Sequence, residues 1–195
     1  MPALTLADAF APDPFADPED AAVSRRYEYL ARCRRVLVGP AVTFVFENRQ
    51  TLWFRFQELA RVARLTEPGQ VQHELDWYSQ LLPDGVGLQA AVWVAEPGRR
   101  PSKALEAVRR ALPLGRIGFR SSTGLEVLGT IRSDRVADRL IGLTRWAEFR
   151  FSPAARAGLA DEQQTWRLFI SAVGYNHESE PLPRAVRQSL LEDLN

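Results

Sequence analysis

The stretch VTFVFENRQTLWFRFQELARVARL, residues 42–65, places a short polar segment between two runs of aromatic and β-branched side chains. In the first run, Val42, Phe44 and Phe46 alternate with residues that are themselves largely apolar. That pattern predicts a strand buried on both faces. The tetrapeptide ENRQ that follows predicts a turn, because polar turn formers separate two β-rich runs.

The second run, Thr51 to Gln57, is compatible with two structures. As a strand, it would place Leu52, Phe54 and Phe56 on one face. As a helix, it would place Leu52 and Phe56 on a stripe that continues into the following segment. Because aromatic residues cluster here with a period of two, we expect a strand, followed by a helix from Glu58.

Helix-capping residues mark most of the other helices. We expect helices from Ser24 to Arg35, from Pro68, after Ser102, Ser133 and Ser152, and from 184 to 194. Alternating patterns predict further strands at 88–95, 115–120, 124–131, 144–152 and 164–173, and a loop at 174–183. Hairpins and helices follow each other without a regular βαβ order. The sequence therefore predicts a single α+β domain with a mainly antiparallel sheet and flanking helices.

The first 20 residues are acidic and rich in proline and alanine. They predict a flexible N-terminal arm, with one domain spanning 21–195. This arm lacks the basic start and continuous apolar run of a signal peptide. No apolar run approaches the roughly 20 residues of a membrane helix. The single Cys33 rules out an internal disulfide. We expect a cytoplasmic protein that does not engage a membrane.

The chain has a formal net charge of +1, which provides no electrostatic case for nucleic-acid binding. Charge is uneven locally, because five arginines and one glutamate lie between residues 25 and 35, just after the acidic arm. We expect these opposite charges to satisfy each other within the molecule. A protein-interaction module that uses the basic helix 25–35 is an alternative.

The common catalytic signatures are missing from the sequence. It has no GxxxxGK[ST] loop, no GxGxxG and no GxSxG elbow. The HELDW segment lacks the second histidine of a zinc-protease helix, since position 77 is Trp77. Neither His73 nor His177 belongs to a Glu-x-x-His unit. The sequence assigns no reaction, cofactor or metal, although carboxylates with one or two histidines can bind a metal without such a signature.

Polar residues gather instead at the expected ends of strands and starts of helices, where scaffolds often present functional groups. The candidate ligand-binding residues are Glu47, Asn48, Arg49, Glu58, Arg61, Glu74 and His177. In this hypothesis Arg49 grips an anionic group, and Glu47 and Glu58 orient that arginine or bind a cation. One alternative is a structural ion-pair network. Another is an enzyme that uses a glutamate of the cluster as general base, assisted by His177.

Several of these residues fall in motifs that resemble a bacterial family, catalogued as domain of unknown function three-five-zero-one. The motifs are Phe46–Arg49, the Gln57–Glu58 pair, and the helix containing Glu74–Asp76 and Tyr78. The resemblance covers most of the chain and is most specific over residues 38–82.

The family resemblance carries two further implications. It aligns His177 with a family Asp-His-Pro run, but Asn176 and Glu178 replace the flanking residues, which places an Asp-oriented histidine in doubt. Family members are similar to proteins encoded beside rubrerythrin and an iron–sulfur oxidoreductase subunit. The resemblance thus implies an accessory or ligand-binding protein with a redox protein partner, linked to redox or peroxide stress. It implies no particular reaction.

Overall fold

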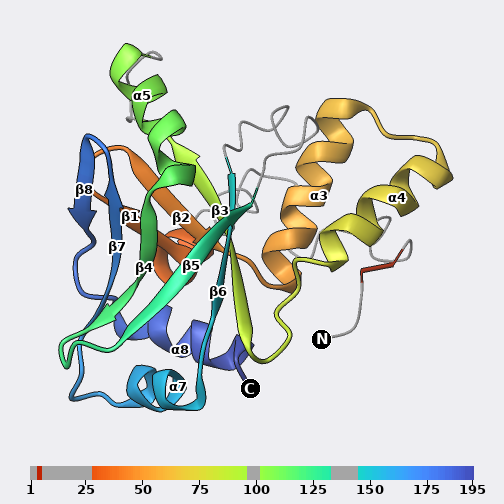
Figure 1. Ribbon diagram of the computed structural model, residues 1–195. Helices are drawn as coiled ribbons and strands as arrows, with labels where there is room; N and C mark the ends of the chain where they lie inside the picture. Colours follow the sequence, from red (N-terminus) through yellow and green to blue (C-terminus); the bar gives the residue numbers. More distant parts are fainter. Residues whose placement is uncertain (1–3, 6–27, 96–101, 133–144) are drawn as a thin grey trace.

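The computed structural model describes residues 4–5, 28–95, 102–132 and 145–195 (Figure 1). These residues form an antiparallel eight-stranded sheet with helices at its ends and on its outer side, which confirms the predicted α+β class. The strand order is β1-β2-β3-β6-β5-β4-β7-β8. The strands are β1 (Arg35–Val38), β2 (Val42–Phe46), β3 (Gly87–Val94), β4 (Arg116–Ser121), β5 (Glu126–Arg132), β6 (Arg145–Arg150), β7 (Trp166–Ala172) and β8 (Tyr175–Glu178).

The sheet curls until its two edge strands nearly meet. The Tyr175 hydroxyl at the start of β8 donates to the Val38 carbonyl (2.6 Å) and accepts from the Ala41 and Val42 amides (3.0 and 3.1 Å). Beside this contact, Gly39 has a φ of 64° and lies so close to the His177 ring that a Cβ would fall 2.5 Å from it. A side chain at position 39 would therefore be excluded by both conformation and space.

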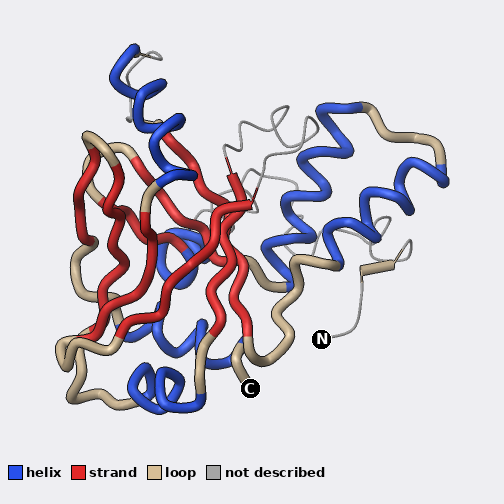
Figure 2. Tube along the Cα trace, viewed as in Figure 1, coloured by secondary structure: helices blue, strands red, loops and turns tan. Residues whose placement is uncertain are grey.

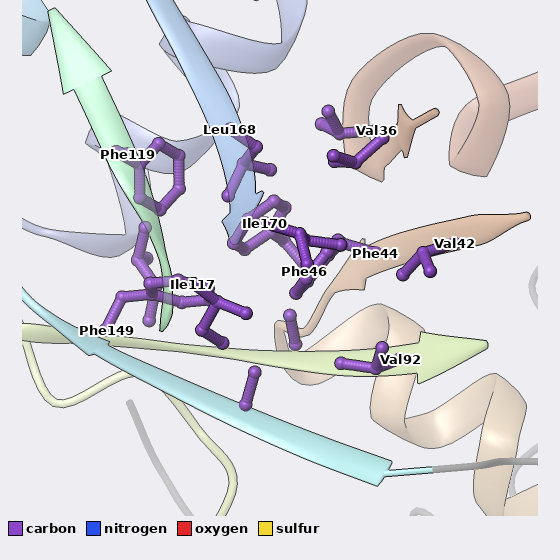
Figure 3. Packing of buried hydrophobic residues seen from close by; sticks show 14 of the residues in the cluster. Val36, Val42, Phe44, Phe46, Val92, Ile117, Phe119, Phe149, Leu168 and Ile170 are labelled. Atoms are coloured by element: carbon purple, nitrogen blue, oxygen red, sulfur yellow. The ribbon is translucent and has the colours of Figure 1, made fainter. Parts of the chain in front are cut away.

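The inner core fills the curl and consists of aliphatic and aromatic side chains from the inward-facing strand positions (Figure 3). Phe119 packs edge-on against Phe149, with ring centres 5.0 Å apart, and Phe46 lies 5.5 Å from Phe119. The helices α7 (Pro153–Ala160) and α8 (Arg184–Asp193) cover the lower end of the curl in Figure 1 and contribute Leu159 and Leu190 to this core.

The outer layer is a second cluster, on the opposite face of β2, β3 and β6. The helical hairpin of α3 (Arg49–Ala63) and α4 (Pro68–Ser79) lies beside the sheet, as Figure 2 shows. It buries Phe56 and Tyr78, among others, together with Trp146 of β6. The remaining described helices are η1 (Leu30–Arg34), α5 (Lys103–Ala111) and η2 (Leu112–Leu114).

The predicted strand at Thr51–Gln57 is wrong, because these residues lie inside α3. Asn48 is the N-cap of that helix, so the expected turn at ENRQ is wrong as well. The Thr51 amide donates to the Asn48 side chain (2.9 Å), and the Asn48 amide donates to the Thr51 hydroxyl (2.8 Å). This reciprocal capping box fixes the start of a helix. The helix can then bury aromatic residues on more than one side, against the sheet and against α4.

Other helix starts agree with the sequence prediction. Pro68 opens α4, and the hydroxyls of Ser102 and Ser152 cap α5 and α7. The loop predicted at 174–183 is wrong in its first part, where a short polar edge strand, β8, pairs with β7. The helices expected from Ser24 and Ser133 begin outside the described residues. Among the described helices, none combines the length and apolar character needed to cross a bilayer.

Candidate functional site

Glu47 is the centre of a polar cluster between the sheet and α3. It follows β2, is fully buried, and donates its amide to the Gln89 carbonyl of β3 at 2.8 Å. One carboxylate oxygen accepts from the Thr51 hydroxyl (2.5 Å), and the other accepts from the Arg55 guanidinium. Glu47, Thr51 and Arg55 are spaced four residues apart, so the first two turns of α3 bring all three together.

Arg55 lies close to two tryptophan rings. Its Cζ carbon lies 5.6 Å from the ring centre of Trp93 on β3 and 5.3 Å from that of Trp146 on β6. Its side chain is 9% exposed. The ion pair with Glu47 and the contacts with the rings compensate for removing the guanidinium from water. The pair carries no net charge.

Two buried polar atoms beside this pair have no hydrogen-bond partner: Nε of Arg55 and Oε1 of Gln89. Gln89 is 7% exposed. Along β3 it shares a face with Ala91 and Trp93, because alternate strand residues point to the same side of a sheet. The two atoms therefore belong to the same outer layer. Buried polar atoms are nearly always paired, so an unpaired donor and an unpaired acceptor here require an explanation.

A chain of hydrogen bonds leads from this cluster to the last helix. The Tyr29 hydroxyl accepts from Asn48 Nδ2 (2.9 Å) and from Arg34 Nε (3.1 Å), and Arg34 also forms an ion pair with Asp193 of α8. Both members of that pair are buried. Arg34, a residue of the predicted basic helix, is thus bound inside the molecule, which counts against its use for an acidic partner.

Burial affects the acid–base properties of the Arg34–Asp193 pair. Burial raises the pKa of Asp193, and the hydrogen bond and positive charge of Arg34 only partly offset this effect. Burial lowers the pKa of Arg34, but the hydrogen bond and charge of Asp193 outweigh it and raise that pKa overall. The pair is a structural connection between η1 and α8.

The predicted site residues divide between this cluster and other places. Glu47 and Asn48 belong to it, and Arg49 is the first residue of α3, although the ion pair described for Glu47 is with Arg55. Glu58 and Arg61 form an ion pair at 2.7 Å on the solvent side of α3. Glu74 lies farther along the hairpin, where it lines a pocket of about 390 Å³ with His73, Gln70, Gly69 and Leu65.

His177 lies away from Glu47. It packs on Tyr175, with ring centres 4.4 Å apart, beside Gly39 in the β1–β2 turn. Glu47 follows the opposite end of β2, roughly 16 Å away along the strand at about 3.3 Å per residue. An enzyme that uses Glu47 as general base with direct help from His177 lacks the required proximity.

Two other features of the described residues do not form a site. A pocket of about 220 Å³ lies between α7 and α8, but Arg187 in its wall donates to the carbonyls of Leu159, Asp161 and Gln164 and so caps the end of α7. Within the described ranges, no group of three or more His, Cys, Asp or Glu side chains is arranged to hold a metal ion.

Sequence reasoning missed Arg55 and Gln89, which complete the cluster. A signal for Arg55 exists, since Glu47, Thr51 and Arg55 repeat every four residues once the segment is assigned as a helix. For Gln89 there is no local signal. The pairing of β2 with β3 places it beside Glu47.

Fold and site together define a single-domain α+β protein with a polar cluster on the outer face of a curled antiparallel sheet. The chain belongs to the family described as protein of unknown function (DUF3501), whose model matches residues 20–194. This match confirms the family resemblance of its sequence motifs.

A crystal structure of a protein of unknown function from Burkholderia pseudomallei is similar to this chain, with a TM-score of 0.68 and 21% identity. The similarity covers 96% of this chain and 100% of that one. At this identity it supports the fold alone. No protein with a curated description matches the chain.

Proposed function

We propose that this chain is a ligand-binding protein and that its site is the outer-layer cluster of Glu47, Arg55, Gln89 and Trp93. The observation that carries the proposal is the pair of unpartnered buried atoms, Arg55 Nε and Gln89 Oε1. A bound ligand would supply the missing acceptor and donor.

A purely structural cluster has little need of Gln89. The Glu47 carboxylate is already satisfied by Thr51 and Arg55. An unpaired buried acceptor costs about 1–3 kcal/mol, which an apolar side chain at position 89 would avoid. A protein that retains such a cost at one place commonly does so at a binding site.

Arg55 suits a binding role because its position is fixed before any ligand arrives. Glu47 accepts from one end of the guanidinium, and the rings of Trp93 and Trp146 both lie close to it. A preorganised donor loses little conformational freedom on binding. The proposal therefore transfers to Arg55 the ligand-gripping role that the sequence suggested for Arg49.

Thermal unfolding in the presence of a library of small polar compounds tests this proposal. At least one compound class should raise the melting temperature of the wild type, because a ligand that binds only the folded state stabilises it. The same class should have little effect on Gln89→Met. Gln72→Met, on the exposed side of α4, is the matched control and should respond as the wild type does. Equal responses in all three proteins would place binding elsewhere and end the proposal.

The cytoplasmic setting, expected from the composition of the sequence, and the link to redox or peroxide stress, implied by the family resemblance, are part of the proposal. A strain that lacks the gene should survive hydrogen peroxide poorly. The wild-type gene should restore survival, and the Gln89→Met gene should not if the link works through this site. Unchanged survival of the deletion strain would remove the redox link without affecting ligand binding.

A further inference from the structure

We propose that residues 4 and 5 act as a releasable strap on the α3–α4 hairpin. Leu4 occupies an apolar socket beside the end of α4, and release of the strap leaves that socket open to another leucine-bearing segment. The inference does not rest on the proposed function, because it uses neither Arg55 nor Gln89.

Leu4 is anchored to the hairpin by two kinds of contact. Its side chain is 3% exposed and belongs to the apolar cluster of the outer layer, which also contains Tyr78 and Leu81. Its backbone amide donates to the Ser79 hydroxyl at the end of α4 (3.0 Å). Figure 1 shows the strap in dark red beside α4. Since Tyr78 and Leu81 lie within two residues of Ser79, the hydroxyl and the apolar side chains mark one socket.

The strap has one buried and one exposed residue. Leu4 is buried, Thr5 is exposed, and the two belong to no helix or strand. Burial of one leucine favours the docked state by roughly 10- to 100-fold. The folded state of a typical domain is favoured by about 10³- to 10⁸-fold. The strap should therefore detach while the sheet and the hairpin stay folded.

The socket recognises features that other segments can supply. The hydrogen bond to Ser79 uses a backbone amide, which every residue except proline carries. The apolar contact requires a side chain of the size and shape of leucine. Peptide-binding surfaces combine the same two elements, since main-chain hydrogen bonds give affinity and a pocket selects the side chain. An empty socket should accept a peptide that has leucine at this position.

The covalent connection explains why the chain's own segment is the normal occupant. Leu4 and Ser79 are 75 residues apart in the sequence, but they belong to one molecule. Such a connection commonly gives the attached segment an effective concentration in the millimolar range. A free peptide must compete with it and should bind well only when the Leu4 side chain is missing.

The test is a nuclear magnetic resonance titration of the whole ¹⁵N-labelled chain with the blocked hexapeptide PALTLA, the sequence of residues 2–7. In Leu4→Ser, the peptide should shift the amide signals of Ser79 and Leu81 with a Kd on the order of 1 mM. The wild type should need about tenfold more peptide or greater, because its own strap competes. Leu114→Ser alters a leucine that is 89% exposed and is the matched control. It should respond as the wild type does, and the peptide PASTLA should not bind.

Hydrogen exchange of the wild type provides an independent measurement. The Leu4 amide should exchange roughly 10- to 100-fold more slowly than a free amide, which reports the docked fraction of the strap. It should exchange faster than the Leu75 amide inside α4. Equal protection of the two amides would show that Leu4 opens only together with the hairpin, and the strap would not be releasable.

Three results of the titration would overturn the inference. Loss of the α3–α4 amide signals in Leu4→Ser would make Leu4 part of the fold. Equal binding of PALTLA to Leu4→Ser and the wild type, or equal binding of PALTLA and PASTLA, would place the peptide outside the socket. Absence of binding to a folded Leu4→Ser would show that the socket closes when Leu4 is removed. None of these results affects the proposed ligand site at Gln89.

Discussion

The inner core and the outer layer use the same strands in opposite ways. On their inward faces, β2, β3 and β6 present Phe44, Ala90 and Phe149, and the contacts there are entirely apolar. On their outward faces, the same strands lead to Glu47, Gln89 and Trp146, where a buried ion pair lies among aromatic rings. The inward face is thus given to apolar packing, whereas the outward face packs apolar side chains around a polar cluster.

The two regions should also differ in cooperativity. The inner core is enclosed by the curled sheet, α7 and α8, whereas the α3–α4 hairpin packs on the outside of the sheet (Figure 1). Elements with one packed side commonly open at lower free energy than the core. Mutations in the two regions should therefore produce different patterns of hydrogen exchange.

The largest effect is expected in the inner core. Phe149→Ala should lower the free energy of unfolding by roughly 3–5 kcal/mol, because Phe44, Phe46 and Phe119 all lose a ring partner. Denaturant unfolding measures the loss, and hydrogen exchange should accelerate in the sheet and in α3 alike. Acceleration confined to the sheet would show that the two regions unfold independently.

A comparable loss is expected when the outer-layer ion pair is broken. Arg55→Met should cost about 3–5 kcal/mol, because it leaves the Glu47 carboxylate buried without its charge partner. Hydrogen exchange should accelerate mainly in α3 and α4. The double variant Glu47→Leu with Arg55→Met should recover much of the loss, since no unpaired charge remains. Additive losses in the double variant would contradict the assignment of the cost to the unpaired carboxylate.

The helix cap makes a smaller contribution. Asn48→Ala should cost about 1 kcal/mol, because it removes the acceptor for the Thr51 amide at the start of α3. It also removes the bond from Asn48 to the Tyr29 hydroxyl. Circular dichroism and denaturant unfolding should show a folded protein of lower stability. A loss as large as that of Arg55→Met would indicate that the whole hydrogen-bond chain to Asp193 fails together.

Gln89→Met should be neutral or stabilising by up to about 1 kcal/mol, because it replaces a buried acceptor that has no partner. This gain in stability should accompany the loss of ligand binding. The combination separates a functional role from a structural one. A clear loss of stability in Gln89→Met would mean that the side chain supports the fold.

The smallest effect concerns pH and an ion pair at the edge of the outer layer. Burial would raise the pKa of Glu148, but Arg132 and Arg150 outweigh it and lower that pKa below the usual value. The carboxylate thus contributes stability above its unfolded-state pKa of about 4.3, and this contribution disappears as the pH falls through the lower folded-state pKa. Glu148→Gln should reduce the change in the free energy of unfolding across this acidic range, by less than about 1 kcal/mol. Unfolding curves between pH 6 and pH 3, measured in buffers of about equal ionic strength, report this change in the pH dependence of stability.

Much of the fold follows from local signals. Pro68, Ser102 and Ser152 each mark a helix start, since a first-turn proline and a capping hydroxyl act through their own backbone. Six of the eight strands, β2 to β7, are recognisable from their alternation or their apolar runs. Local chemistry therefore predicted the class and most of the elements.

The errors arose where packing decides the outcome. Trp53, Phe54 and Phe56 indicate a strand by composition, but the sheet and α4 supply apolar partners on several sides of α3. The polar segment of β8 resembles a loop, and pairing with β7 makes it a strand. Glu47 was identified as a candidate, whereas Gln89 was not, because only the register of the sheet brings position 89 to position 47.

The Tyr175 hydroxyl closes the curl where no strand ladder does. The edges of a sheet carry unpaired amides and carbonyls, and these can pair with other chains and start aggregation. Here one phenol oxygen occupies three backbone groups at the β1–β2 turn, and β8 is drawn toward that turn. A single side chain therefore ties the start of one edge strand, β8, to the turn beside the other edge strand, β1.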